Sequence, residues 1–339
     1  MNPRPSSLAP IRVLAMFVML VSWQQGTAAE TYALVVSGDP GRPVVKPEST
    51  LGDWSVNFSR WRDAWAKLLT DTYHIPAADL QLLRSPDPSA AAATSTTQIP
   101  SAELASRDHV LSALANLVHQ STADDQVLLV LIGHGYHSGT SGRFCLPGGD
   151  LSDTDLQDAF AKLACRELIV LVLAPDCRDI ARSLSGPGRV IILGNIRTSA
   201  PYFSEFLLRA LGRGGVPLLT AFNQASLDCI HWYQNQEWQE ERKAWVVHGT
   251  QNQEIWRLFY PRGTMFAGDD QPHVIVNTND PTKVDDIVGR RLIAEVAGLD
   301  DNGDGTVSTV YESGPVPTSL NGSAPADGAL AATIILGKP

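Results

Sequence analysis

Runs of aliphatic residues alternate along the chain with segments in which apolar residues recur every three or four positions. Five runs predict strands, of which the second is short: residues 31–38, 78–83, 124–133, 167–174 and 188–195. The longer runs are apolar at almost every position rather than at alternate ones, which is typical of strands buried on both faces. We therefore expect an α/β fold with a mostly parallel sheet covered by helices on both faces.

The first predicted helix, residues 57–73, has the clearest helical pattern. Its apolar positions share one face, and they are Phe58, Trp61, Trp65, Leu68 and Leu69. Further helices are predicted at residues 102–120, 152–164, 177–184 and 201–214. Two polar stretches predict surface loops, residues 85–102, which are small and broken by proline, and residues 134–151.

The first 29 residues are typical of a secretion signal. Arg4 and Arg12 precede or flank the apolar run VLAMFVMLVSW, and Thr27 and Ala29 offer small residues to a signal peptidase. An uncleaved anchor is the alternative, but this run is shorter than the roughly 20 residues that a membrane-spanning helix needs. We therefore expect an exported chain, periplasmic or secreted, with no membrane anchor after cleavage.

Charge restricts the partners of the chain. It has 26 Lys and Arg against 36 Asp and Glu, a formal charge of −10. Removing residues 1–29 takes away two arginines and no acid, so 24 cations against 36 anions leave −12. A chain this acidic is not expected to bind nucleic acid or anionic lipid. The sequence has no zinc spacing of His and Cys and no GxxxxGK phosphate motif, so no cofactor is expected.

Two reactive side chains follow two of the predicted strands. His134 stands in VLLVLIGHG, after the run at 124–133, and Cys177 stands in LIVLVLAPDC, after the run at 167–174. In open parallel sheets, ligands bind at the carboxyl ends of the strands. If these two strands are neighbours, right-handed crossovers bring both side chains to one edge, a strand spacing or two apart.

An imidazole beside a thiol can perform acyl transfer. A thiolate attacks a carbonyl carbon, the imidazole protonates the leaving amine, and backbone N–H groups hold the oxyanion. Gly135 allows close approach of a substrate, and its N–H with that of Cys177 could form the oxyanion hole. The alternative is structural, because a histidine between glycines is often a turn residue and cysteine is commonly buried.

Several motifs occur together in a specific order. They are LVLIGHG, RFCLPGGDLSDTDLQDAFAKL, LIVLVLAPDC, GRVIILGNIRTS and YFSEFLLRALGRG, with 43 residues from His134 to Cys177. On these segments the chain from Tyr32 to about Leu211 resembles the caspase/legumain superfamily of cysteine peptidases, most closely its bacterial legumain-like family. The resemblance implies a caspase-like three-layer fold, with His134 as general acid and base, Cys177 as nucleophile and the Gly135 N–H in the oxyanion hole.

The resemblance also implies a domain organisation and a function. Residues 1–29 would be the signal peptide and residues 30–230 the caspase-like catalytic domain. Residues 231–339 would extend the same domain, with a Trp/Gln-rich insertion, an Asp/Asn/Gly turn and a final strand. The implied function is that of an exported cysteine endopeptidase that cleaves a peptide or protein substrate through an acyl-enzyme intermediate. Two alternatives stay open: a weak or inactive relative that binds peptide or envelope partners, and a binding protein with a structural Cys177.

One departure from the family concerns the turn after the nucleophile. The family usually has a glycine two residues after the cysteine, whereas here Cys177 is followed by Arg178 and Asp179. Arg143 or Arg178 could pair an acidic substrate side chain, and a surface ion pair is the alternative for either. Four cysteines in an exported chain could all be paired, but a catalytic Cys177 would leave at most one internal bridge. Cys145 and Cys165 are the candidate pair for that bridge.

The acidic stretch DDNGDGTVSTVYE is a candidate calcium loop. Asp300, Asn302 and Asp304 occupy positions 1, 3 and 5, but Tyr311 occupies position 12, where a bidentate Glu belongs. A structural turn is the alternative. Residues 231–260 are dense in Trp and Gln, and they predict either an insertion that lines a cleft or amphipathic elements packed on the sheet.

Overall fold

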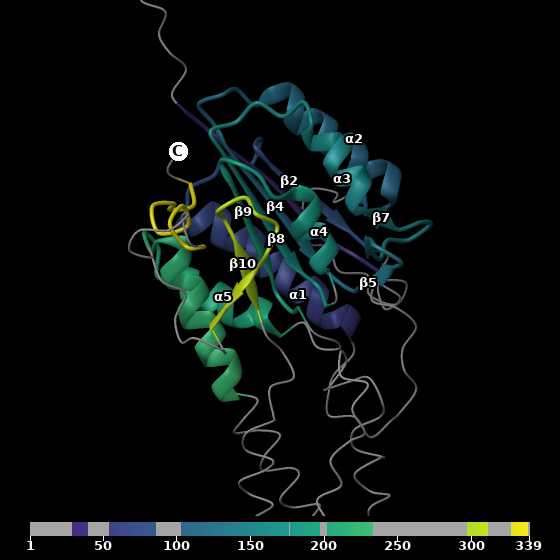
Figure 1. Ribbon diagram of the computed structural model, residues 1–339. Helices are drawn as coiled ribbons and strands as arrows, with labels where there is room; N and C mark the ends of the chain where they lie inside the picture. The colour runs from purple at the N-terminus through teal and green to yellow at the C-terminus, as the bar shows by residue number, and fades with distance from the viewer. Residues whose placement is uncertain are drawn as a thin grey trace, which may run out of the picture.

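The central feature of the fold is an eight-stranded sheet. The computed structural model describes residues 29–39, 54–85, 103–175, 177–196, 202–232, 297–310 and 327–337. Within them the strand order is β11-β10-β9-β8-β4-β1-β2-β3 (Figure 1). The strands are β1 (Thr31–Ser37), β2 (Leu80–Arg84), β3 (Glu103–Leu104), β4 (Gln126–Ile132), β8 (Glu167–Leu173), β9 (Arg189–Leu193), β10 (Gly298–Asp300) and β11 (Ser308–Thr309). Neighbouring strands are parallel, except that β10 runs antiparallel to β9 and β11.

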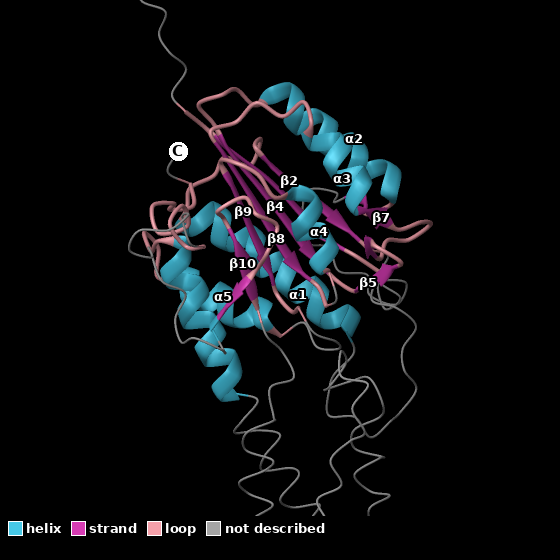
Figure 2. Cartoon of the chain, in the orientation of Figure 1, coloured by secondary structure: helices cyan, strands magenta, loops and turns pink. Residues whose placement is uncertain are grey.

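Helices cover both faces of this sheet. One face carries α1 (Trp54–Lys67), its continuation η1 (Leu68–Thr72), α5 (Phe203–Leu211) and the helical residues 218–232. The other face carries α2 (Arg107–Gln120), α3 (Asp153–Phe160) and α4 (Arg178–Leu184), as Figure 2 shows. The predicted three-layer α/β fold with a mostly parallel sheet is therefore confirmed.

The unbroken aliphatic runs are explained by two apolar cores, one on each face of the sheet. In β4, Leu128, Val130 and Ile132 pack toward α1 and α5. Their neighbours Leu129 and Leu131 pack toward α2, α3 and α4. Because successive side chains of a strand point to opposite faces, a strand buried on both faces is apolar at nearly every position. Every residue of β4 is buried, and its one polar residue, Gln126, donates to Glu167 at 2.9 Å and accepts from Gly337 N–H at 3.0 Å.

Two polar segments fold differently from the prediction. The helix expected over 102–120 begins only at Arg107, capped by the Ser106 side chain, because residues 103–104 pair with β2 as β3. The loop expected over 134–151 is instead a small antiparallel sheet. Its strands are β5 (Gly135–Ser138), β6 (Ser141–Phe144) and β7 (Leu151–Ser152), in the order β5-β6-β7. A two-residue turn joins β5 to β6, with Gly139 at φ 66°.

The C-terminal segment, residues 327–337, forms turns. The short strand β11 follows the Asp/Asn/Gly turn, and residues 311–326 lie outside the described part of the chain. Instead of pairing with the sheet, the C-terminal segment closes the N-terminal end of the helical residues 218–232. Leu218 N–H donates to the Ile334 carbonyl at 2.9 Å, and Leu219 N–H donates to the Ala331 carbonyl at 3.0 Å. These bonds satisfy backbone donors that a helix leaves unpaired in its first turn.

Three sequence predictions fall almost entirely outside the described residues. They are the signal peptide at 1–29, the loop at 85–102 and the Trp/Gln-rich stretch at 231–260. None of the helices in the described part of the chain combines the length and apolar character that crossing a bilayer requires.

Replacing Asp301 should loosen the C-terminal segment. Its buried carboxylate accepts the N–H groups of Gly328 and Ala331, both at 2.7 Å. We expect Asp301→Ala to lower the free energy of unfolding by roughly 2 to 4 kcal/mol, because two buried donors lose their acceptor. Asp304→Ala, in the same turn but exposed, is the control. Equal losses in urea unfolding of the two variants would contradict this account.

Candidate active site

The register of two neighbouring strands places the candidate dyad. β4 and β8 are adjacent and parallel, and their last residues, Ile132 and Leu173, are directly paired. Gly133 N–H donates to the Leu173 carbonyl at 3.4 Å, so the segments that follow β4 and β8 begin side by side. His134 follows β4 by two residues and Cys177 follows β8 by four. The condition set by the sequence, that the two strands be neighbours, is therefore confirmed.

Cys177 lies at the start of α4 in a closed environment. It is the N-cap residue of that helix, which was predicted over residues 177–184, and its side chain makes no capping hydrogen bond. Its Sγ donates to the Pro175 carbonyl at 3.2 Å and lies 4.0 Å from the Arg143 carbonyl oxygen. The residue is 0 % exposed. In this arrangement, the resting form, Sγ faces two backbone carbonyl oxygens and is enclosed away from solvent.

Gly135 lies against the sulfur of Cys177. A Cβ atom added at Gly135 would collide with that Sγ and would also lie 2.8 Å from the Pro175 carbonyl oxygen. The absence of a side chain is therefore what lets β5 approach α4. The sequence predicted that a substrate approaches closely at Gly135, which stays a prediction; in the structure the group next to Gly135 is the thiol of Cys177.

The N–H of Gly135 faces away from its partner strand. The His134 carbonyl accepts a hydrogen bond from Cys145 N–H at 2.9 Å. Bonded and outward-facing residues alternate along an antiparallel strand, so the next residue, Gly135, directs its N–H and C=O away from β6. This orientation is the one that an oxyanion-hole donor needs.

His134 contacts an aromatic ring that the sequence did not assign to the site. The imidazole meets Phe58 of α1 edge to face, with ring centroids 5.1 Å apart and planes at 70°. Phe58 is buried, so the contact restricts the orientation of the imidazole. The helical pattern placed Phe58 on the core face of α1, but nothing local links it to a residue 76 positions later.

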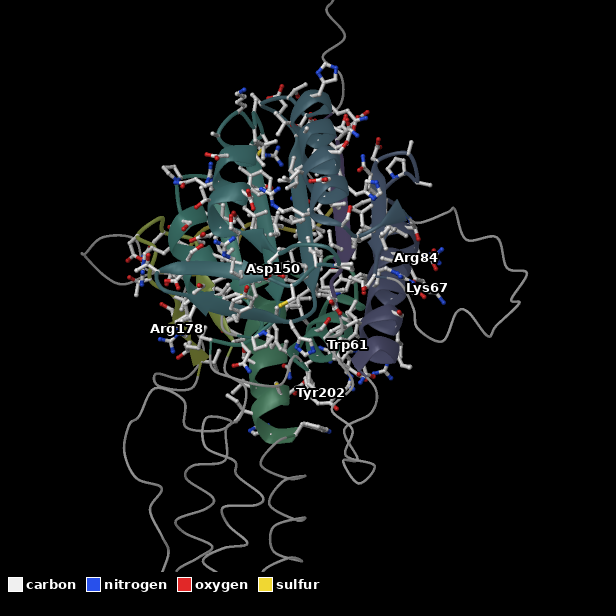
Figure 3. The ribbon with its side chains drawn as sticks, turned by 90° about the vertical axis from the view of Figure 1, so that its right-hand side faces the viewer. Trp61, Lys67, Arg84, Asp150, Arg178 and Tyr202 are labelled. Atoms are coloured by element: carbon white, nitrogen blue, oxygen red, sulfur yellow. The ribbon has the colours of Figure 1, made fainter. Side chains whose placement is uncertain are left out.

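An aromatic row continues from Phe58 away from the dyad. Phe58 lies 6.1 Å from Trp61, and Trp61 lies 6.0 Å from Tyr202 between ring centroids. Figure 3 shows Trp61 and Tyr202 at the same end of the molecule. Beyond Trp61, a groove of about 450 Å³ runs between α1 and α5, with Arg60 and Glu205 on its walls. Neither His134 nor Cys177 lines this groove.

The two arginines weighed as partners of an acidic substrate have different surroundings. Arg178 Nε donates to the Ile196 carbonyl at 2.9 Å, and Asp179 pairs with Arg182 at 3.1 Å. The turn after Cys177 is thus held by contacts within the chain. Arg143 stands on β6 opposite Tyr136, and its carbonyl oxygen is the one near the thiol.

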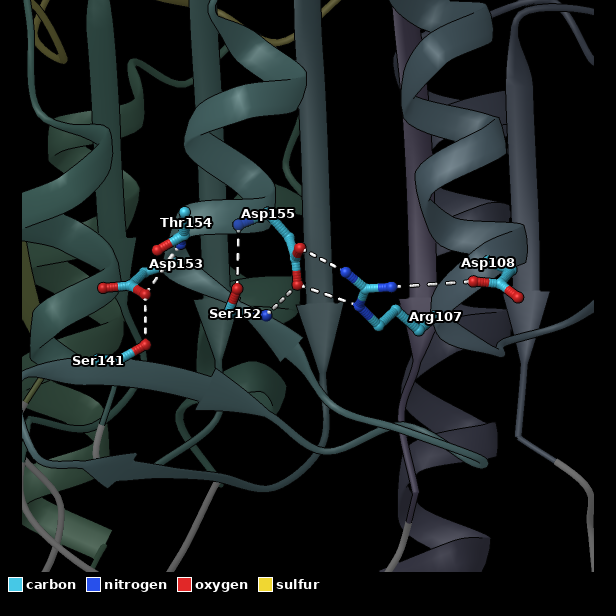
Figure 4. Close-up of polar contacts among 7 residues, drawn as sticks. All are labelled: Arg107, Asp108, Ser141, Ser152, Asp153, Thr154 and Asp155. Carbon is cyan, nitrogen blue, oxygen red and sulfur yellow. Dashed lines mark hydrogen bonds and ion pairs between the residues drawn. The ribbon is translucent and has the colours of Figure 1, made fainter.

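A buried carboxylate joins the elements around the thiol. Asp153 accepts from Ser141 Oγ of β6 at 2.6 Å and from Thr154 N–H at 2.9 Å (Figure 4). It also accepts from Ser183 Oγ of α4 at 2.9 Å. Burial by itself would raise the pKa of Asp153, but these bonds and one from Gly142 N–H lower it. The carboxylate is therefore charged and bound at neutral pH.

A second carboxylate on α3 faces away from the thiol. Asp155 accepts two bonds from Arg107, at 2.6 and 3.1 Å, and forms a capping box with Ser152 (Figure 4). Burial opposes its ionisation, yet the bonds from Arg107 and Ser152 lower its pKa to about 2. Asp155 therefore fastens α3 to α2, whereas Asp153 fastens α3 to β6 and α4.

The predicted disulfide between Cys145 and Cys165 is wrong, because both are thiols. Cys145 lies at the carboxyl edge, where its carbonyl accepts from Asp39 N–H at 2.9 Å. Cys165 precedes β8 at the opposite edge of the sheet. Seven strand residues at about 3.3 Å each separate the two ends, far more than the span of about 6 Å that a disulfide allows between Cα atoms.

The calcium candidates form a turn. Asp304 accepts Thr306 N–H at 2.7 Å, Asn302 Oδ1 accepts Asp304 N–H at 2.9 Å, and Asp300 accepts Gly303 N–H at 3.3 Å. One oxygen of each residue thus accepts from a backbone donor of the same segment. Among the described residues, no group of three His, Cys, Asp or Glu could hold a metal ion. The Asp/Asn/Gly turn is present as expected, and calcium binding by these residues stays a prediction.

Comparison with known proteins gives distant likenesses alone. No family model matches the chain, and no curated protein matches it. A solved structure of a protein from Geobacter sulfurreducens is 14% identical, with a TM-score of 0.39, and covers 58% of this chain and 87% of its own. Caspase-1 from Spodoptera frugiperda is 11% identical, with a TM-score of 0.35, and covers 58% and 77%. Both TM-scores lie below 0.5, so neither likeness assigns a function to this chain, and membership of the legumain-like family stays a prediction.

A methyl group at Gly135 should disrupt the site. We expect Gly135→Ala to push β5 away from α4 and to cost about 1 to 3 kcal/mol of unfolding free energy, because the added atom has no space. Gly186→Ala is the matched control, since its Cβ would meet an arginine side chain at an ordinary 3.6 Å. Thermal unfolding of both variants checks this, and an unchanged Gly135→Ala protein would show that the contact is loose.

The thiols of Cys145 and Cys165 should be unreactive near neutral pH. Burial raises the pKa of each to about 11. At pH 8 only about one such thiol in a thousand is thiolate, and the fraction rises as pH approaches 11. Alkylation mapped by mass spectrometry between pH 7 and 11 should show slow labelling at both until the highest pH. Rapid labelling of the folded chain at pH 8 would contradict the assignment.

Proposed function

We propose that the chain is a cysteine peptidase in which Cys177 is the nucleophile and His134 the general acid and base. The observation that carries the proposal is that β4 and β8 end at paired residues, which brings a histidine and a cysteine to the ligand-binding edge of a parallel sheet. Contact of Gly135 with the sulfur, and the direction of its N–H, support the same assignment. The substrate is a peptide or protein.

The reaction would follow the acyl-transfer sequence. The proton of Cys177 Sγ passes to the His134 imidazole, and the thiolate adds to the scissile carbonyl carbon. The Gly135 N–H stabilises the oxyanion. The C–N bond then breaks as the imidazolium protonates the leaving amine, which leaves a thioester on Cys177. Water, deprotonated by His134, attacks the thioester, so the carboxylate product leaves and the thiol is restored.

The resting form has to open before this reaction begins. Sγ must leave the Pro175 carbonyl, and β5 must move off the sulfur for a carbonyl carbon to reach it. The covered thiol also favours a second candidate function, a weak or inactive relative that binds peptides without cleaving them. We infer export from the first 29 residues, which places either function in the periplasm or outside the cell.

The test compares purified protein with Cys177→Ala and His134→Ala on a diverse peptide library. If the dyad is catalytic, Cys177→Ala should lower cleavage by at least about 10³-fold and His134→Ala by about 10² to 10⁴-fold. His137→Ala, which alters an exposed histidine of neighbouring β5, is the control and should cleave within twofold of the parent. Failure of the parent protein to cleave, with peptide binding retained, would leave the second candidate.

A further inference from the structure

Asp153 lies where three elements around the thiol meet. It is 5% exposed and is the first residue of α3. One carboxylate oxygen accepts from Ser141 of β6 and the other from Ser183 of α4. The reaction proposed above gives Asp153 no part, although no other described carboxylate bonds to both β6 and α4.

The two elements joined by Asp153 enclose the sulfur of Cys177. α4 begins directly after Cys177, and β6 contributes the Arg143 carbonyl oxygen that lies 4.0 Å from Sγ. β6 also holds β5, whose Gly135 covers the sulfur. The separation of β6 from α4 therefore sets how closely the thiol is enclosed and where the Gly135 N–H lies relative to it.

No side chain separates β6 from α4 at this point. A Cβ at Gly142 would lie 2.8 Å from Ile180 Cγ1 and 3.0 Å from the Ile180 nitrogen, so the strand rests directly on the first turn of the helix. Packing prevents β6 from moving closer. The bonds of Asp153 to Ser141 and Ser183 oppose movement apart, so packing and hydrogen bonding together fix one separation.

We propose that Asp153 is a positioning residue of the active site, which fixes β6 and β5 at one distance from α4 and thereby sets the geometry around Cys177. The proposal rests on the assignment of Cys177 as nucleophile. It requires a carboxylate because the site supplies donors: two hydroxyls and the N–H groups of Thr154 and Gly142. An amide would replace one acceptor oxygen by an NH₂ group that cannot accept from them.

Asp155 provides a matched control on the same helix. It lies two residues further along and accepts hydrogen bonds of similar length, 2.6 and 3.0 Å, from Arg107 of α2 and from Ser152, the last residue of β7 and the N-cap of α3, so neither partner belongs to β6 or α4. Removing its charge should therefore destabilise the fold without altering the separation of β6 from α4. Any difference in kcat or in Cys177 labelling between Asp153→Asn and Asp155→Asn then reflects the place of the altered carboxylate and not a general loss of stability.

The experiment measures three quantities on the full chain and both variants, at a temperature where circular dichroism shows each fully folded. They are kcat and KM for a peptide selected from the library, and the rate of iodoacetamide labelling of Cys177 mapped by mass spectrometry. For Asp153→Asn we expect kcat to fall about 10 to 100-fold with KM within twofold, because misplacement by about 1 Å has this effect on rate. Labelling of Cys177 should rise at least tenfold, because its cover is loosened. Asp155→Asn should leave all three within twofold.

Two results would overturn the proposal: parental kcat and labelling in Asp153→Asn, or equal changes in both variants. If the parent protein cleaves no peptide, the proposed function fails, and the labelling contrast alone decides whether Asp153 positions the thiol. If Asp153→Asn does not fold, Ser183→Ala removes one donor from α4 and takes its place, with Ser152→Ala as its control. Labelling raised in Ser183→Ala alone supports the proposal, and equal labelling contradicts it.

Discussion

The pairing of Ile132 with Leu173 is the constraint on which the rest of the site depends. When two parallel strands end in register, the segments that follow them begin at the same level of the sheet. The residues that follow are therefore confined to one small volume, whatever their side chains. A shift of the pairing by one residue would turn every side chain of one strand to the other core, so the apolar layers on both faces fix the position of His134 relative to Cys177.

Once the ends of β4 and β8 are fixed, the short polar segment that forms β5 and β6 encloses the thiol of Cys177. The chain leaves β4 and immediately folds back as β5 and β6, which lie on α4. Glycine at 135 and at 142 removes the side chains that would hold the strand and the helix apart. Asp153 then holds the layers together through hydroxyl donors from both sides. Packing brings the layers into contact, and the buried charge keeps them there.

The sequence was sufficient for the parts of the fold that are governed by continuous apolar burial. The strands ending at Ile132 and Leu173, and the start of α4 after Cys177, follow from such runs. It was insufficient for β5 and β6, because GYHS and SGRF carry no apolar alternation and become strands only by pairing with each other. It also could not show that Cys145 and Cys165 leave opposite edges of the sheet, or that Phe58 meets the His134 ring, since sequence spacing carries no spatial distance.

The contact between Gly135 and Cys177 is needed for the proposed reaction but also blocks access to the sulfur. Gly135 must lie near Cys177 if its N–H is to reach an oxyanion on the substrate, yet in the resting form its backbone covers the sulfur. Opening is therefore easier by movement of β5 than of α4. Ile180, Ala181 and Leu184 anchor α4 in the core, whereas three of the four residues of β5 are exposed and it is the edge strand of its sheet. Segments with few buried contacts open at the lowest free-energy cost, so β5 is the element whose motion would expose the nucleophile.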